Sequence, residues 1–384
     1  MNILIYTFHY PFPKNVDLVP DTKVIQYFAN ELMRKGHRVQ VVHLHYYPVK
    51  EISLKHLRYI LPQEKKYEID GVPVRLYLYQ MLTPHRFYPE KFQAGVINRR
   101  LRKMKKENGW KADKVFVHFP TTFTGLTEIF TDTDATLGDF HNIDVWLLKE
   151  NDPRGEALAF IKRLRTKGYR NKRVHERLRE LCGDEPVPVY TGIDRELLAT
   201  PEWIDEKKQN RSSVLRVLYA GQLIPLKNVD ILIEAFKMLS VPAELTIVGD
   251  GSEMPKLREL AGERDDIVFT GWLEREKALE KMNTADVFVM VSSPETYGMV
   301  YLEAMARGCI NVASRGEGFD GLIRDGENGF LLTPRNADQI RELLERISTM
   351  PDDERNRLID AGYAMACAMT EDQTTQGFLD AAGE

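Results

Sequence analysis

Short apolar runs of strand length alternate with helical segments along this chain, and this alternation constrains its fold more than any other feature. The first runs lie at residues 2–8, 37–44, 115–119 and 135–141, and a helix is predicted at 23–34, between the first two runs. Buried strands that alternate with helices are typical of a parallel, doubly wound α/β sheet. Ligands of such sheets bind beyond the carboxyl ends of the strands, so the loops that follow the strands are the candidate site.

The second half of the chain repeats the same alternation. Strands are predicted at 214–221, 243–249, 266–271, 285–291, 309–313 and 329–332, and helices at 228–239, 254–261, 274–282 and 337–350. A length of 384 residues with 43% apolar content suits two domains rather than one core. We therefore predict a first domain at 1–195, a polar linker at 196–213, a second domain at 214–350, and a helical tail at 351–384 that packs back on the first domain.

The stretch from 292 to 308, SSPETYGMVYLEAMARG, carries Glu295 and Glu303. On one continuous helix this spacing would place the two side chains about 80° apart, so they would not share a face. A strand, a loop at 292–298 and a helix from Met299 onward fit the pattern better. Backbone N–H groups of 297–300 would then point out of a helix N-terminus, where the dipole favours an anion such as phosphate. A carboxylate on each side of a phosphate site suits a hydroxyl-rich ligand such as a sugar nucleotide.

The charge of the chain is unevenly divided between its halves. Residues 1–200 hold 33 Lys and Arg against 24 Asp and Glu, a net of +9, and the remainder holds 20 against 33, a net of −13. The first half is therefore expected to be attracted to anionic surfaces. Its basic excess lies mostly in 89–110 and 157–181, and both segments are predicted to be helical.

The segment 89–110 allows two interpretations. Phe92, Val96, Leu101 and Met104 have apolar spacing, and basic residues crowd the other positions. A membrane-surface helix would gain about 1 kcal/mol per basic residue near an anionic lipid surface. We favour a solvated helix that packs on the sheet through its apolar stripe, because a crossover helix is needed at this place in the chain.

Cysteine usage and apolar run lengths exclude several classes of protein. Cys182, Cys309 and Cys367 are an odd set without CxxC or Cys/His spacing, which is typical of reduced thiols in a cytosolic protein. The N-terminus lacks the basic flank of a signal peptide, and no apolar run approaches ~18 residues. We therefore expect a cytoplasmic protein without a disulfide or zinc framework and without a transmembrane span.

Five segments of the second half, 220–236, 246–253, 266–272, 295–308 and 325–332, resemble in order and spacing the retaining nucleotide-sugar glycosyltransferases of family 4. The strongest match is PETYGMVYLEAMARG against the E-x7-E signature of that family. The first half matches more loosely, through GDFHN and through YTGID, which resembles the YNGID of the family. The resemblance implies the GT-B architecture, in which two Rossmann-like domains face a central cleft.

The resemblance also implies the site residues. Donor-binding roles fall on Gln222, Gly249, Trp272, Tyr297, Gly298, Met299, Val300 and Glu303, and catalytic roles on Glu295, Lys227 and His141. Glu303 would accept hydrogen bonds from the ribose, Glu295 would hold hydroxyls of the transferred sugar, and Lys227 would stabilise the leaving diphosphate. Trp272 would lie near the nucleobase and His141 near the reacting centre. No metal or other cofactor is expected, because cationic side chains and backbone dipoles would neutralise the diphosphate.

Each of these residues also has a structural interpretation. Lys227 and Glu303 would then be surface residues, and Trp272 a packing residue. Of the two histidines His118 and His141, we favour His141 as the functional one.

Three departures from the family pattern bear on activity. Gln222 stands where the family has Arg, the first loop (residues 11–22) lacks the usual glycine pair, and Gly321 replaces a Glu. Loss of one charge-assisted phosphate contact costs about 1.5–3 kcal/mol unless another cation replaces it. Lys14 and Arg315 are candidates for that replacement.

The resemblance predicts transfer of a hexosyl-type unit, with retention, from a nucleoside-diphosphate sugar to a glycan or lipid-linked acceptor. A UDP-sugar is the favoured donor, and the expected setting is polysaccharide or glycolipid synthesis. We expect no nucleic-acid partner, and peripheral contact with an anionic membrane at its cytoplasmic face is compatible with the basic first half. The alternatives are a GT-B protein that binds nucleotide or glycan as a partner subunit without turnover and a nucleotide-sugar 2-epimerase.

Overall fold

A computed structural model describes residues 1–12, 23–49, 56–84, 87–150, 152 and 154–383, with the side chains of 149 and 150 left out. The candidate Lys14 lies outside the described residues. Contacts divide the chain into two compact units. Unit 1 comprises Met1–Arg170, Val174–Thr191 and Thr374–Glu384, and unit 2 comprises Asn171–Arg173 and Gly192–Gln373.

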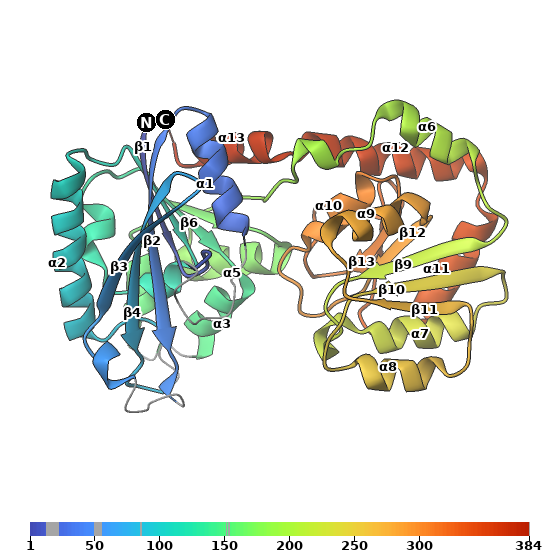
Figure 1. The fold of residues 1–384 in the computed structure, drawn as a ribbon, viewed down its shortest axis with the longest axis horizontal. Coiled ribbons are helices and arrows are strands. Elements are labelled where there is room, and N and C mark those ends of the chain that lie inside the picture. Colours follow the sequence, from blue (N-terminus) through green and yellow to red (C-terminus); the bar gives the residue numbers. More distant parts are fainter. Residues whose placement is uncertain (13–22, 50–55, 85–86, 151, 153, 384) are drawn as a thin grey trace. The chain divides into compact units, whose positions relative to one another are not determined.

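Unit 1 is built on a sheet in which the described strands follow the order β3-β4-β2-β1-β5-β6-β7-β8 (Figure 1). The strands are β1 (Asn2–Thr7), β2 (Arg38–Tyr47), β3 (Gln63–Ile69), β4 (Val72–Gln80), β5 (Lys114–His118), β6 (Thr136–Phe140), β7 (Thr166–Tyr169) and β8 (Val187–Pro188). All neighbours pair in parallel except β3 with β4. The carboxyl ends of β1, β5, β6 and β7 therefore meet at one edge of the sheet.

Helices cover both faces of this sheet. They are α1 (Val24–Arg34), α2 (Lys91–Asn108), α3 (Asn142–Glu150), α4 (Glu156–Ile161), α5 (Lys172–Cys182) and α13 (Glu371–Ala381), with 3₁₀ turns at Leu57–Tyr59, Pro120–Phe123 and Thr127–Phe130. Apolar side chains of α1 and α13 share one core with β1, and those of α2 to α5 share a second core on the opposite face. Buried Lys114 on β5 donates to the carbonyl of Leu379 at 2.8 Å, which helps to hold the end of α13 in unit 1.

Helix α2 packs as a crossover helix. Ala94, Ile97, Leu101 and Met104 are buried in the core, whereas Phe92 is exposed. Side chains of Glu90 and Gln93 form a capping box at its start, which satisfies two free amide groups. The apolar stripe therefore faces the sheet, and the exposed surface of α2 is basic rather than amphipathic.

Two parts of unit 1 differ from the sequence-based expectation. Residues 157–181 were predicted to be helical, but β7 interrupts them between α4 and α5, so that prediction is wrong in its middle. The antiparallel pair β3 and β4 was not predicted. Its turn contains Asp70, with φ 51°, and Gly71, with φ 79°. An Asp-Gly pair between two alternating runs is a hairpin signal, because both turn residues need positive φ.

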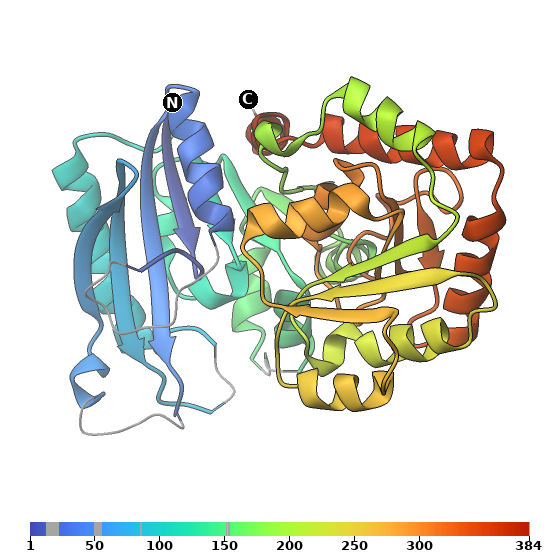
Figure 2. The ribbon, with the colours of Figure 1, turned by 45° about the vertical axis from the view of Figure 1, so that its right-hand side comes forward.

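Unit 2 is a parallel sheet in the order β11-β10-β9-β12-β13-β14, with helices on both sides (Figures 1 and 2). Its strands are β9 (Leu215–Ala220), β10 (Ala243–Val248), β11 (Ile267–Gly271), β12 (Val287–Met290), β13 (Ile310–Ser314) and β14 (Phe330–Leu332). Its helices are α6 (Pro201–Gln209), α7 (Val229–Lys237), α8 (Met254–Ala261), α9 (Arg275–Thr284), α10 (Met299–Met305), α11 (Ala337–Thr349) and α12 (Asp352–Ala368), with 3₁₀ turns at Arg195–Leu197 and Pro225–Lys227. Every strand and helix predicted for 214–350 is present. Two α/β doubly wound sheets confirm the predicted fold class.

The ends of unit 2 are helical. The polar stretch after residue 200 forms α6, whose N-cap Thr200 accepts a hydrogen bond from the Trp203 amide at 3.3 Å. The tail divides between the units, since α12 packs on α10 of unit 2 and most of α13 belongs to unit 1. No helix in the described parts of the chain combines the length and apolarity needed to cross a membrane.

Candidate active site

Two loops of unit 2 are fastened together at the carboxyl ends of β9 and β12. The side-chain amide of Asn228 donates to the carbonyl of Val291 at 2.8 Å, and the Ser293 amide donates to the carbonyl of Leu226 at 2.8 Å. Asn228 has φ 50°, a left-handed conformation that Asn tolerates better than most residues. Nη1 of Arg335 donates to the side-chain oxygen Oδ1 of Asn228 at 2.8 Å. These hydrogen bonds fix the backbone position of the neighbouring residue, Lys227.

Lys227 and Glu295 meet between these loops. The ammonium of Lys227 lies 2.6 Å from Oε2 of Glu295. Glu317, which is buried, accepts from the Glu295 amide at 2.9 Å and from the Ser293 hydroxyl at 3.0 Å. An ammonium has three donors, so Lys227 can keep this contact and still bind a phosphate. The structure thus brings together two residues that the resemblance assigns to adjoining parts of one donor, the diphosphate and the transferred sugar.

Glu303 lies on α10 and pairs with Arg275 at the start of α9. Nε and Nη2 of Arg275 lie 3.0 and 2.7 Å from the same oxygen, Oε1 of Glu303. Within the described residues, Oε2 of Glu303 accepts no hydrogen bond. Glu303 therefore has an ionic partner in Arg275, and it keeps a carboxylate oxygen that can accept a hydrogen bond from a ligand hydroxyl.

Two glycines allow backbone segments to approach closely here. Gly249 has φ 134°, and a Cβ at this position would lie 1.9 Å from the carbonyl oxygen of Gly221. Gly298 has φ 87°, and a Cβ there would lie 2.7 Å from the ring of Tyr301. Contact with the backbone of Gly221 explains Gly249, and contact with the Tyr301 ring explains Gly298, whether or not these glycines also contact a donor. The amides of Met299 and Val300 begin α10, where no intrahelical acceptor is available to them.

The other predicted residues of unit 2 are more spread out. Tyr297 is buried against Phe319, with ring centroids 5.1 Å apart. Trp272 is 67% exposed, so packing does not account for it. Gln222 is exposed, and its carbonyl accepts from the Tyr219 hydroxyl at 2.9 Å. Arg315, the candidate replacement cation, pairs with Asp325 at 2.7 Å, and this pairing weakens its case.

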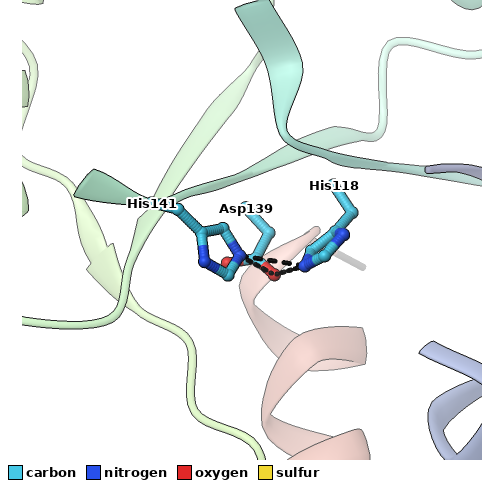
Figure 3. Close-up of side chains that lie close together, drawn as sticks. All are labelled: His118, Asp139 and His141. Carbon is cyan, nitrogen blue, oxygen red and sulfur yellow. Dashed lines mark hydrogen bonds and ion pairs between the residues drawn. The ribbon is translucent and has the colours of Figure 1, made fainter. Parts of the chain in front are cut away.

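A second polar cluster lies in unit 1, at the carboxyl ends of β5, β6 and β7. Figure 3 shows the imidazoles of His118 and His141 and the carboxylate of Asp139 pointing toward one another. The two Nε2 atoms are 2.9 Å apart, and each lies 3.6 Å from Oδ2 of Asp139. Arg170 donates hydrogen bonds to both carboxylate oxygens of Asp139. Its Nε lies 2.9 Å from Oδ1 and its Nη2 lies 2.6 Å from Oδ2.

The charges of this cluster are strongly coupled. Burial raises the pKa of Asp139, but the guanidinium of Arg170 and the two imidazoles outweigh this effect and hold that pKa well below its usual range. Burial lowers the pKa of His118 and of His141, and for His141 the nearby Asp139 only partly opposes this effect. Both histidines are therefore neutral at pH 7.

One further acid, Asp144, supports the loop that carries His141. Its carboxylate accepts from the His141 amide at 2.9 Å, from the Thr121 amide at 3.1 Å and from the Thr121 hydroxyl at 2.6 Å. Burial raises the pKa of Asp144 to about 7, and these hydrogen bonds oppose the rise.

His118, Asp139 and His141 form a group whose ligand atoms could hold a metal ion, since they lie within 4.8 Å of one another. Arg170 argues against this use. Its guanidinium already neutralises Asp139, so a divalent cation would leave excess positive charge among buried groups. The expectation of a metal-free protein stays a prediction.

Sequence reasoning did not find Arg275, Glu317, Asp139 or Arg170. One signal was available for Asp139, because it precedes His141 by two positions and alternate residues of a strand point to the same side. Arg170 offered no local signal, since it follows a strand of only four residues that lacked a recognisable pattern.

Comparisons with known proteins agree with this architecture. Residues 202–365 match the family described as Glycosyl transferases group 1. The Rhizobium meliloti protein "Lipopolysaccharide core biosynthesis glycosyltransferase LpsE" is 34% identical over 150 residues, which are 38% of this chain and 43% of that protein. The Arabidopsis thaliana "Sulfoquinovosyl transferase SQD2" is 31% identical over 146 residues, 37% of this chain and 28% of that protein. The chain thus matches less than half the length of these relatives.

Structural similarity extends further along the chain. The crystal structure of Anabaena Alr3699/HepE in complex with UDP and glucose matches with a TM-score of 0.63 over 99% of this chain and 98% of that chain. The sequence identity is 17%, so this match bears on the fold alone. The matched region contains the Lys227–Glu295 and Arg275–Glu303 pairs. Residues 202–365 therefore belong to the glycosyl transferases group 1 family, as predicted.

Proposed function

We propose that this protein is a retaining glycosyltransferase that moves a hexosyl-type unit from a nucleoside-diphosphate sugar, preferably a UDP-sugar, to a glycan or lipid-linked acceptor. The observation that carries the proposal is the placement of the Lys227–Glu295 and Arg275–Glu303 pairs on neighbouring loops and helices of unit 2. Two carboxylates suit sugar and ribose hydroxyls, and an ammonium suits a diphosphate. Polysaccharide or glycolipid synthesis is the setting we propose, and the similarity to the lipopolysaccharide core biosynthesis glycosyltransferase LpsE supports it.

In the proposed reaction, the bond between C1 of the sugar and the diphosphate oxygen breaks. A bond from the acceptor hydroxyl oxygen to C1 forms on the same face, and the hydroxyl proton passes to the leaving diphosphate. Lys227 stabilises the charge that develops on the diphosphate, and the amides at the start of α10 assist. Glu303 holds the ribose through Oε2, Glu295 holds the sugar, and Trp272 offers an exposed ring for the nucleobase.

A donor panel tests this proposal. Purified protein is incubated with UDP-, GDP- and ADP-sugars, with and without a lipid-linked acceptor, and nucleotide release is measured. Acceptor-dependent release from one donor is the expected result. If no donor in the panel releases nucleotide and UDP leaves the melting temperature of the protein unchanged, the proposal is refuted.

Gln222 favours a second candidate function, in which the protein binds nucleotide or glycan as a partner subunit without turnover. The missing charge weakens the grip on the diphosphate more than it weakens the contacts of Glu303 to ribose. Nucleotide binding without release from any donor would support this candidate. Formation of an epimerised nucleotide sugar without acceptor would instead favour a 2-epimerase.

We propose that contact with an anionic membrane at its cytoplasmic face is electrostatic. Most of the apolar stripe of α2 is buried, with Phe92 exposed, so α2 offers mainly its exposed basic side chains to such a surface. Sedimentation with vesicles that contain anionic lipid should therefore fall steeply with added salt. Binding that salt leaves unchanged would contradict an electrostatic origin.

A further inference from the structure

We infer that His118 is a positioning residue for His141. With the Asp139–Arg170 pair, it holds His141 as the neutral tautomer protonated on Nε2, so that Nδ1 is left as a hydrogen-bond acceptor for a substrate hydroxyl. The tautomer follows from the geometry of unit 1 alone. Only the use of Nδ1 by a substrate rests on the proposed function.

Thr7, the last residue of β1, determines which nitrogen of His118 carries the proton. Its hydroxyl oxygen lies 2.9 Å from the carbonyl oxygen of His9 and 3.0 Å from the His9 amide nitrogen. Two oxygens at 2.9 Å repel one another unless a proton lies between them, so the single hydroxyl proton of Thr7 points to the carbonyl. Nδ1 of His118, 3.2 Å from the same hydroxyl oxygen, must then be the donor in that contact.

This assignment determines the rest of the pair. A neutral His118 with its proton on Nδ1 has a lone pair on Nε2. Nε2 of His141 lies 2.9 Å from that lone pair and must carry a proton, because two bare nitrogens would repel at this distance. His141 is therefore left with an unprotonated Nδ1.

The surroundings keep this arrangement in place. Arg170 donates to both oxygens of Asp139, which holds the carboxylate beside the two Nε2 atoms. The ring of His141 stacks on Phe119 with centroids 4.1 Å apart and planes 15° apart. Its side chain is 13% exposed, so the ring keeps some access to a ligand.

The chemical consequence is specific. A neutral acceptor can orient a hydroxyl of an acceptor or sugar, but it cannot act as a cation toward phosphate.

Nitrogen-15 NMR of histidine-labelled protein tests the tautomers without any activity assay. Signals of the pair are assigned by their loss in His118→Gln and His141→Gln, with His175, which pairs with Glu185 at 2.9 Å, as the reference outside the cluster. At pH 7 we expect His118 protonated on Nδ1 only and His141 on Nε2 only. A proton on Nδ1 of His141 would overturn the inference. A stoichiometric shift of both Nε2 signals with Zn²⁺ would also overturn it, because the cluster would then be a metal site.

A pair of variants tests the positioning role. Glutamine at 118 can accept from Nε2 of His141 through its side-chain oxygen, whereas leucine cannot. We expect His118→Leu to lower kcat about tenfold with an unchanged donor KM, and His118→Gln to restore most of the loss. Equal activity of the leucine and glutamine variants would refute the role. If wild type turns over no donor, the proposed function fails, but the NMR result still decides the tautomer.

Discussion

The candidate site of unit 2 carries its charges in two partly exposed ion pairs, whereas the polar cluster of unit 1 carries its charges in buried groups. The side chains of Arg275 and Glu303 are 39% and 16% exposed, and those of Arg170 and Asp139 are both 4% exposed. Partly exposed pairs gain little net stability, because water competes for both partners. Ligand groups can therefore replace one partner at small cost.

The buried pair behaves differently. Asp139 and Arg170 have lost their hydration, so each depends on the other, and removal of one partner leaves an uncompensated charge. We therefore expect the pairs of unit 2 to exchange partners with a ligand, and the cluster of unit 1 to hold an uncharged histidine pair in a fixed geometry.

Arg170→Met is expected to have the largest effect on stability. It leaves Asp139 buried beside two neutral imidazoles, which should cost about 3–5 kcal/mol of unfolding free energy. Arg275→Met is the matched control in unit 2 and should cost at most about 1 kcal/mol. Denaturant unfolding of both variants measures the difference, and equal losses would show that burial does not separate the two regions.

The pH dependence of stability should come next in size. Asp144 has a pKa of about 7 in the folded protein and about 3.9 when unfolded, so the folded state binds the proton more tightly. The stability that this proton contributes is present below pH 4 and is lost as pH rises to 7, by roughly 4 kcal/mol in all at about 1.4 kcal/mol per unit.

The check compares unfolding free energies of wild type and Asp144→Asn from pH 4 to 8. Relative to the variant, wild type should lose stability up to pH 7 and then level off. A difference that is constant with pH would mean that the three hydrogen bonds to the carboxylate outweigh its burial.

Lys227→Ala is expected to lower turnover at least ~10²-fold, the scale of one lost transition-state electrostatic contact, or about 2.7 kcal/mol. Lys256→Ala, at an exposed lysine that pairs with Glu253, is the matched control and should turn over like wild type. Nucleotide release with the best donor gives both rates. Wild-type turnover by Lys227→Ala would mean that the reacting diphosphate is held elsewhere.

Unit 2 was the easier region to predict, for a physical reason. Glu295 and Glu303 belong to one strand, loop and helix, and local signals determine such a segment: β12 is apolar, Gly298 permits the left-handed turn, and α10 has helical spacing. Lys227 could be identified as a candidate site residue only through the family resemblance. Its contact with Glu295 depends on two loops that meet only when β9 and β12 pair.

The cluster of unit 1 was harder to predict because its members come from separate strands. His118 and His141 were considered singly, but their 2.9 Å contact depends on the pairing of β5 with β6. Arg170 reaches Asp139 from the position after β7, a strand of four residues that is too short for a reliable pattern within a basic segment. Residues that stabilise one another across a sheet leave no periodicity in the sequence.

The smallest predicted effect concerns Gln222. Gln222→Arg restores the positive charge that the family pattern has at this position, and it should raise turnover about tenfold through one charge-assisted hydrogen bond. Because Gln222 is exposed, this substitution should leave stability unchanged. Gln222→Met, which is uncharged and of similar length, separates the effect of charge from that of shape. Its turnover should equal that of wild type or be lower. A fall in turnover with Gln222→Arg would mean that the site is built around an amide at this position, and that the donor is bound with fewer positive charges than the family pattern implies.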